Sequence, residues 1–170
     1  MYQFEAVQPT GARTCSAIAR KEPATHHWLD HDIEAFAKEH DDLAQGKLEP
    51  RLSRREHLDA LGVFASLRRR AAQGKLAVGP DRTYRARTLS SRGPWVIELR
   101  PQLSGGSPPP RLFRLYYAEP LAVDGALLPL VLKTKPNGGD PDREQDEAID
   151  DAKARGRAWA LYRAMEEGKK

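Results

Sequence analysis

The apolar residues of this chain change their spacing near Gly74. Before that glycine they recur every three to four residues, which places them on one face of a helix. After it they alternate with polar residues, which is typical of half-buried strands. The order of the two patterns predicts an α+β fold, with helices packed on a small antiparallel sheet of about four strands and a further helix at the C-terminus.

Two amphipathic helices are expected before the change of spacing. The first runs from a cap at Thr25 to about Leu43. The second follows Ser53-Arg54-Arg55-Glu56, a capping box in which the serine and the glutamate satisfy opposite backbone donors, and it ends at Gly74. The expected buried faces comprise Leu29, Ile33, Phe36, His40 and Leu43 in the first helix, and Leu58, Leu61, Phe64, Leu67 and Ala71 in the second. A short polar link makes the pair a helical hairpin.

Four strand segments follow, at residues 83–89, 95–100, 111–117 and 127–135. Turn-forming residues separate them, so an antiparallel meander is the simplest topology. Pro129 predicts a bulge or an edge in the last strand. Asp140-Pro141 opens a final helix, and its expected buried face comprises Ile149, Ala152, Gly156, Trp159 and Tyr162, with Gly156 allowing close packing on a neighbour.

The chain of 170 residues is expected to form one domain over residues 25–165. Residues 1–24 form an extension with a candidate strand near its start, and residues 166–170 form a tail. No stretch approaches the roughly 20 apolar residues of a membrane span, and the start lacks the pattern of a signal peptide. The single cysteine, Cys15, excludes an internal disulfide and a cysteine-based zinc site. We therefore expect a cytoplasmic protein without a membrane partner.

The net charge of the chain is +4, but positive and negative residues are distributed unevenly along it. Residues 1–50 carry −4, residues 51–118 carry +10, residues 119–152 carry −6 and residues 153–170 carry +4. A central segment of this charge is typical of polyanion binding. The alternative is a solvated surface in a chain rich in arginine, and the acidic flanks argue against indiscriminate coating of DNA.

Side chains alternate between the two faces of a strand, and this parity predicts a basic cluster on one face of the sheet. Three neighbouring strands place their cations and one tyrosine on the same surface, namely Arg100, Arg114, Tyr116, Lys133 and Lys135, and Arg85, Arg87 and Arg111 extend it as candidate RNA-binding residues. The alternative is the ordinary polar face of a half-buried sheet. An arginine on this face is expected to contribute little to the core.

Such a cluster suits phosphodiester chemistry. Arginines bind a phosphate through two hydrogen bonds and stabilise the charge that develops on its oxygens. A lysine crowded by other cations has a lowered pKa and can act as a base. With RNA the 2′-hydroxyl is the nucleophile, so neither a metal nor a covalent residue is required. All five histidines precede the sheet, which leaves Lys133, Lys135, Tyr116 and Glu98 as candidate bases.

Other chemistries have little support in the sequence. His27 and His31 lie one helical turn apart beside Asp30, but this spacing is common by chance and no HExxH motif is present. There is no GxSxG motif, no phosphate-binding P-loop and no dinucleotide-binding GxGxxG motif. We expect neither a metal nor a cofactor.

A series of short motifs, in order, carries a resemblance to a known family. The motifs are the turn Val78-Gly79-Pro80, the strand Trp95-Val96-Ile97-Glu98-Leu99-Arg100, the strand Phe113-Arg114-Leu115-Tyr116-Tyr117, the strand Leu130-Val131-Leu132-Lys133-Thr134-Lys135 and the helix start Pro141-Asp142-Arg143-Glu144. Over about residues 33–162 the chain resembles the RelE/ParE toxin superfamily, closest to its HigB-like, phage-derived branch. Residues 1–30, the 105–110 loop and the 118–126 segment are longer than a compact member needs, and the sheet lacks the histidine of some active members.

The resemblance implies a microbial RNase-like fold and a toxin of a toxin–antitoxin system that cleaves mRNA on the translating ribosome. It also implies a cognate antitoxin that covers the basic face, with the toxin a monomer alone or part of a hetero-oligomer. Arg100, Arg114, Tyr116, Lys133 and Lys135 are then the candidate catalytic residues. Two alternatives remain open: a non-nucleolytic relative that binds a protein such as DNA gyrase, and a nucleic-acid-binding phage accessory protein.

Overall fold

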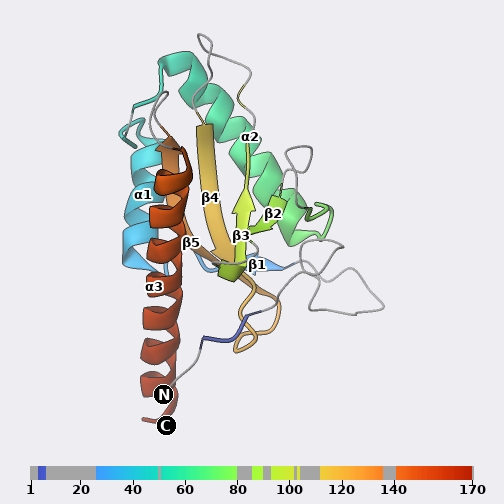
Figure 1. Cartoon of the computed structure of the whole chain (residues 1–170), viewed down its shortest axis with the longest axis vertical. Helices are drawn as coiled ribbons and strands as arrows, with labels where there is room; N and C mark the ends of the chain where they lie inside the picture. Colours follow the sequence, from blue (N-terminus) through green and yellow to red (C-terminus); the bar gives the residue numbers. More distant parts are fainter. Residues whose placement is uncertain are drawn as a thin grey trace.

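The structure is a computed structural model that describes residues 4–6, 26–49, 51–79, 86–89, 93–101, 103, 112–135 and 141–169. Within these ranges the chain is an α+β protein with three helices and one mixed sheet (Figure 1). The elements follow in the order β1 (His27–Trp28), α1 (Glu34–Ala44), α2 (Arg54–Ala72), β2 (Ala86–Leu89), β3 (Gly93–Leu99), β4 (Leu112–Ala118), β5 (Ala126–Lys135) and α3 (Pro141–Glu167).

The sheet has the strand order β1-β5-β4-β3-β2. Strands β2 to β5 form the antiparallel meander that the sequence predicts. The register shifts between Tyr116 and Tyr117, where Tyr117 lies opposite Pro129. This irregularity confirms the bulge expected at that proline, because proline has no amide hydrogen to donate to a neighbouring strand.

The short strand β1 replaces the first turns of a predicted helix. His27 N donates to Gly125 O at 2.9 Å and Leu29 N donates to Leu127 O at 3.0 Å, so β1 runs parallel to β5. The edge of β5 offers backbone partners to this segment, and α1 begins only after its N-cap at Ile33. The prediction of a helix from Thr25 was therefore wrong at its start.

The second helix begins as predicted. Glu56 N donates to the Ser53 hydroxyl at 3.3 Å, and Ser53 N donates to the Glu56 carboxylate at 2.8 Å. These two bonds satisfy backbone donors that the first turn of a helix leaves without partners. Leu58, expected to be buried, is 62% exposed. The expected hairpin is not clearly formed, because α1 lies along β5 whereas α2 extends away from it (Figure 1).

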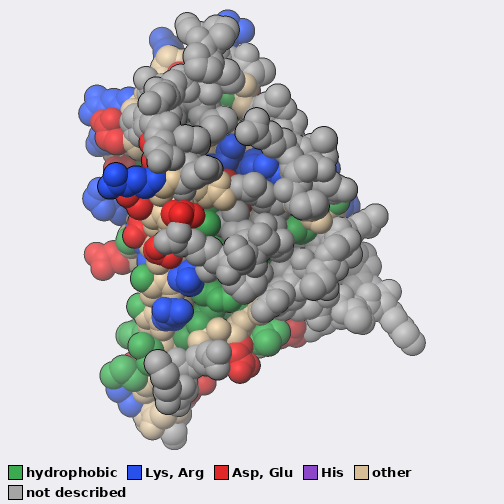
Figure 2. All heavy atoms as spheres, viewed as in Figure 1, with side chains coloured by type: hydrophobic (Ala, Val, Ile, Leu, Met, Phe, Trp, Pro, Cys, Tyr) green, Lys and Arg blue, Asp and Glu red, His purple; other side chains and the backbone are tan. Residues whose placement is uncertain are grey.

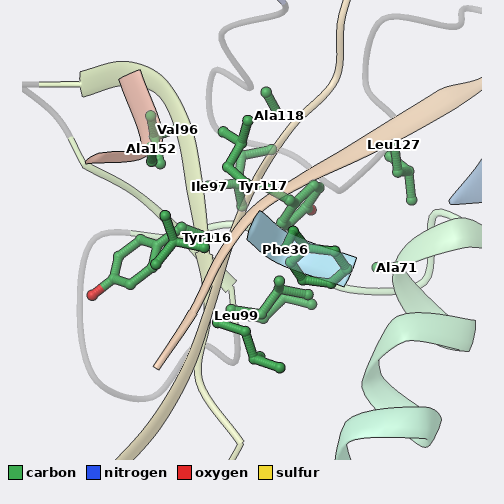
Figure 3. Close-up of a cluster of buried hydrophobic side chains, with 14 of the residues drawn as sticks. Phe36, Ala71, Val96, Ile97, Leu99, Tyr116, Tyr117, Ala118, Leu127 and Ala152 are labelled. Atoms are coloured by element: carbon green, nitrogen blue, oxygen red, sulfur yellow. The ribbon is translucent and has the colours of Figure 1, made fainter. Parts of the chain in front are cut away.

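The two faces of the sheet are covered by different helices. On one face Phe64 of α2 packs edge-on against Phe113 of β4, with ring centroids 5.3 Å apart. The side chains of Tyr116 and Tyr117 lie on opposite sides of β4, as alternation along a strand requires (Figure 3). Tyr117 joins the cluster that contains Phe36, so this face holds the larger part of the core.

Helix α3 covers the other face and contacts β3, β4 and β5. A side-chain carbon added at Gly156 would lie 3.0 Å from the ring of Trp95, which confirms that this glycine permits close packing. Trp95 packs toward α3, although simple alternation along β3 would place it on the same face as Ile97. The pairing of β2 with β3 is irregular at Leu89 and Gly93, which interrupts the alternation. Tyr162 is exposed, whereas the other residues of the expected buried face, Ile149, Ala152, Gly156 and Trp159, are buried.

No helix in the described ranges is both long enough and apolar enough to cross a membrane. The candidate strand near the start of the chain is described only at residues 4–6, where Ala6 forms an isolated antiparallel bridge with Pro120. Phe4 is buried there, and its ring lies 4.5 Å from that of Trp95. These three residues therefore belong to the packed body of the protein.

Candidate functional site

Strand pairing brings part of the predicted basic cluster together. Arg114 of β4 lies directly opposite Lys133 of β5, and Tyr116 lies opposite Glu98 of β3. Directly opposed residues project to the same face of a sheet. Arg114, Tyr116 and Lys133 therefore share the face that parity assigned to them.

These three side chains line a pocket of about 230 Å³ between the sheet and the start of α3. Thr134 and Ala148 contribute to the wall, and Glu144 and Glu147 of α3 complete it. The two glutamates were not predicted as site residues. The acidic residues in the first turns of the final helix were the available signal, but acidic residues are common at a helix N-terminus because they interact favourably with the helix dipole.

Arg114 is held by a carboxylate on the neighbouring strand. Its Nε lies 2.9 Å from Glu98 Oε1, and the two side chains are 13% and 2% exposed. Its Nη1 also donates to Phe113 O at 2.8 Å. The ion pair occupies Glu98, so this carboxylate is a poor candidate for a base, whereas Arg114 is fixed in orientation at the wall of the pocket.

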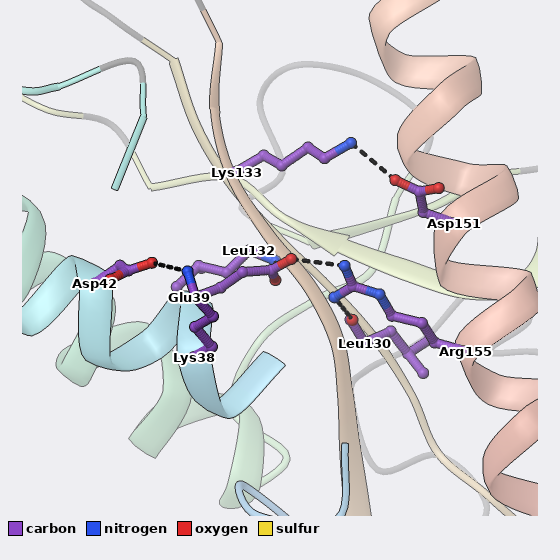
Figure 4. Close-up of polar contacts among 8 residues, drawn as sticks. All are labelled: Lys38, Glu39, Asp42, Leu130, Leu132, Lys133, Asp151 and Arg155. Carbon is purple, nitrogen blue, oxygen red and sulfur yellow. Dashed lines mark hydrogen bonds and ion pairs between the residues drawn. The ribbon is translucent and has the colours of Figure 1, made fainter. Parts of the chain in front are cut away.

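Lys133 forms a more exposed ion pair with α3. Its Nζ lies 3.0 Å from Asp151 Oδ2, and the two side chains are 39% and 51% exposed (Figure 4). Exposed pairs of this kind contribute at most about 1 kcal/mol, because solvent screens the charges. The ammonium of Lys133 can therefore exchange Asp151 for an incoming anion at small cost.

The basic face is not an open surface, contrary to the prediction. Arg100 and Tyr116 are buried, and Arg114 is mostly covered. Helix α3 contacts β3, β4 and β5, and its residues line the pocket beside Arg114 and Tyr116. Strand parity assigns side chains to a face but does not determine what packs on that face. The resulting site is a pocket at the margin of α3, with Lys133 at its more exposed side.

Several predicted residues lie outside the described residues. Arg85 and Arg111 do so entirely. Arg87 and Lys135 are described only as backbone, where Arg87 lies opposite Glu98 and Lys135 lies opposite Leu112. The role assigned to these four residues stays a prediction.

A separate group of polar and aromatic side chains lies on the α2 side of the sheet. The guanidinium of Arg68 pairs with Asp30 and lies 4.4 Å from the ring centroid of Trp28. His40 lies between Phe36 and Phe64, with ring centroids 5.9 and 6.1 Å away. Burial, aided by the charge of Arg68, lowers the pKa of His40 below its ordinary value of 6.5. These contacts join β1, α1 and α2.

The described residues contain no group of three or more potential metal ligands among their histidine, cysteine, aspartate and glutamate side chains. His27 lies in β1 and His31 lies in the turn before α1, so the two are not on one helix as expected. Asp30, between them in sequence, pairs with Arg68.

Comparison of the chain with protein-family models, with curated proteins and with solved structures finds no match. The pocket lined by Arg114, Tyr116 and Lys133 is the structural basis for a proposed function. It brings two cations, a phenol and two carboxylates together in one small volume. It lies on the face of the sheet that α3 covers, opposite the face that packs against α2.

Proposed function

We propose that this protein is a metal-independent endoribonuclease of the RelE/ParE type, the toxin of a toxin–antitoxin pair, which cleaves mRNA on the translating ribosome. The observation that carries the proposal is the convergence of Arg114, Tyr116 and Lys133 on one pocket. Two cations and a phenol at one site match the needs of a phosphodiester, whose oxygens gain charge during cleavage. A substrate on the ribosome places the protein in the cytoplasm.

The order of the elements also supports the proposal. Two helices precede a four-stranded antiparallel meander, and a third helix follows it. This is the order of motifs on which the resemblance to the toxin superfamily rests. We therefore also propose the finer description of the fold, namely a microbial RNase-like fold with an N-terminal helical hairpin.

In the proposed reaction the 2′-oxygen of the RNA attacks the adjacent phosphorus and the bond to the 5′-oxygen breaks. A base takes the proton of the 2′-hydroxyl, and an acid returns a proton to the 5′-oxygen. Arg114, oriented by Glu98, stabilises the charge on the phosphate oxygens, and Lys133 leaves Asp151 to do the same. Glu144 and Glu147 join Tyr116 as candidate bases because they line the same pocket. Lys133 is a base only in the alternative arrangement in which it is neutral and Arg114 alone stabilises the phosphate oxygens.

The proposal is tested by primer extension on translated mRNA with purified protein. Lys133→Ala should reduce cleavage by about 10²–10³, the usual effect of removing one preorganised donor. Lys38→Ala is the matched control, since Lys38 also pairs with an aspartate at 3.0 Å, on the exposed side of α1. Equal cleavage by wild type and by the Lys133 variant would place the chemistry elsewhere.

A second candidate function is binding of a protein target without RNA cleavage. The observation that favours it is that both pocket cations are already neutralised by carboxylates, Arg114 by Glu98 and Lys133 by Asp151. Under this alternative, wild-type protein leaves translated mRNA intact. If the target is DNA gyrase, the protein inhibits supercoiling in a purified assay, which separates the two functions.

A further inference from the structure

The outer face of α2 carries positive charge that no described residue neutralises. Its exposed cations are Arg54, Arg55, Arg69, Arg70 and, just beyond the end of the helix, Lys75. Among the described residues, none of these five side chains forms an ion pair or a hydrogen bond. Of the two acidic residues of the helix, Glu56 is buried and Asp59 is half-buried. We call the five cations the α2 basic face.

The charges are arranged differently on the rest of the molecule. Along the side formed by α1 and α3, basic and acidic side chains lie next to one another (Figure 2). Exposed lysines there form ion pairs, for example Lys38 with Asp42 and Lys169 with Glu166. The two cations of the pocket are paired as well. Within the described ranges the largest group of unpaired cations is therefore the α2 basic face.

The stability of the fold does not account for several residues of this face. Arg54 and Arg55 are the first two residues of α2, where the helix dipole disfavours positive charge. Ser53 and Glu56 already cap this turn. Gly62 lowers the helix propensity, although nothing lies within 4 Å of a side-chain carbon added there. Two arginines and a glycine that the helix does not need indicate a partner outside the chain.

The cations form two groups with small side chains between them. The groups at residues 54–55 and 69–70 are about 22 Å apart along the helix axis, at 1.5 Å for each residue. Between them the same side of the helix presents Leu58, Gly62 and Ala65, all exposed. A single phosphate or carboxylate would reach only one group, whereas a nucleic acid backbone carries charges at regular intervals and reaches both. Arginine also binds phosphate oxygens through two hydrogen bonds.

We propose that α2 binds double-stranded DNA, with its outer face in the major groove and the two groups of arginines on the phosphates at either side. The major groove of B-DNA is about 12 Å wide, and an α-helix with its side chains measures about 10–12 Å across. Gly62 and Ala65 allow the helix to lie deep in the groove. The A-form RNA duplex has a deep and narrow major groove that does not admit a helix.

This contact is separate from the proposed cleavage of mRNA, because α2 and the pocket lie on opposite faces of the sheet. Leu58, Gly62 and Ala65 have no polar side-chain atoms with which to read base edges. The contacts therefore go mainly to phosphates, and we expect binding that depends little on the DNA sequence.

The first experiment measures the fluorescence anisotropy of a labelled DNA duplex of about 20 base pairs, from about 50 to 200 mM salt. Wild type should bind with a micromolar dissociation constant, and log affinity should fall with log salt with a slope of about −4. Arg54→Gln/Arg69→Gln should weaken binding by about tenfold and reduce the slope by about 2. Lys38→Gln/Lys169→Gln is the matched control, because it removes the same charge from paired lysines and should bind as wild type does.

The second experiment tests the groove. Gly62→Trp should weaken binding severalfold, because the ring would hold α2 away from the base pairs, while circular dichroism should show an unchanged fold. An RNA duplex of the same sequence should bind about tenfold more weakly than DNA.

Four results would overturn the proposal: no binding of DNA by wild type, equal affinities of the arginine and lysine double variants, an unchanged affinity of Gly62→Trp, or RNA bound as tightly as DNA. Displacement of the DNA by polyglutamate at an equal concentration of charge would assign the α2 basic face to an acidic protein, and would overturn it too.

Discussion

Arg155 of α3 and Glu39 of α1 meet across the outer edge of β5, with Arg155 Nη2 at 2.7 Å from Glu39 Oε1 (Figure 4). Arg155 Nη1 also donates to Leu130 O at 2.7 Å, and Glu39 Oε2 accepts from Leu132 N at 2.7 Å. Beyond the two residues paired with β1, these side chains bind two of the backbone groups that β5 presents at its edge, one at Leu130 and one at Leu132. This part of the edge is thereby closed to pairing with another strand.

Replacing Arg155 with leucine should lower the free energy of unfolding by about 1–3 kcal/mol, because Leu130 O loses a charged donor and Glu39 loses its counterion. Urea denaturation monitored by circular dichroism measures the change. Lys38→Leu, which removes an exposed pair within α1, should alter stability by less than about 1 kcal/mol. Equal effects of the two substitutions would contradict a special role for the β5 edge.

Arg114→Ala should destabilise the protein by about 3–5 kcal/mol, since it removes the counterion of a carboxylate that is 2% exposed. This reverses the expectation that an arginine on the polar face contributes little to the fold. Adding Glu98→Gln should restore much of the loss, because the buried charge is then absent. A melting temperature of Arg114→Ala equal to that of wild type would refute this prediction.

Gly156→Val should destabilise by about 1–3 kcal/mol, because its side chain would collide with the ring of Trp95 and push α3 from the sheet. Gly62→Ala is the control in α2, where nothing lies within 4 Å of the added carbon. It should stabilise by up to about 1 kcal/mol through the higher helix propensity of alanine. Chemical denaturation measures the unfolding free energy of both variants. A loss of stability in Gly156→Val but not in Gly62→Ala would show that the contact with Trp95 causes it, and not the replacement of a glycine as such.

His40 should make stability depend on pH below 6.5. Burial and Arg68 lower its pKa in the folded state, so the unfolded chain binds a proton more readily. Stability is therefore fully present above the ordinary pKa of 6.5 and is lost as the pH falls through that value toward the lower pKa of the folded state. His40→Gln should flatten this part of the curve of unfolding free energy against pH.

His27→Gln is the control for that measurement, since His27 is exposed in β1. Its curve should keep the slope of wild type. A His40→Gln curve as steep as that of wild type would show that another group carries the pH dependence.

Local patterns in the sequence were sufficient for most of the secondary structure. The change of spacing near Gly74 separated helices from strands, Ser53 and Glu56 marked the start of α2, and Pro129 marked the bulge in β5. Each signal depends on neighbours within a few residues, and such interactions are encoded locally. Parity likewise placed Arg114 and Lys133 on one face, because alternation along a strand is a local property.

Contacts between distant segments decided the rest. The edge of β5 turned His27 and Trp28 into a strand, although their local pattern favours a helix. Packing of α3 covered the basic face, buried Tyr116 and brought Glu144 and Glu147 to the pocket. The sequence by itself determined the elements and the faces of their side chains, and only the tertiary structure decided which faces meet, because such contacts depend on how residues far apart in the chain pack together.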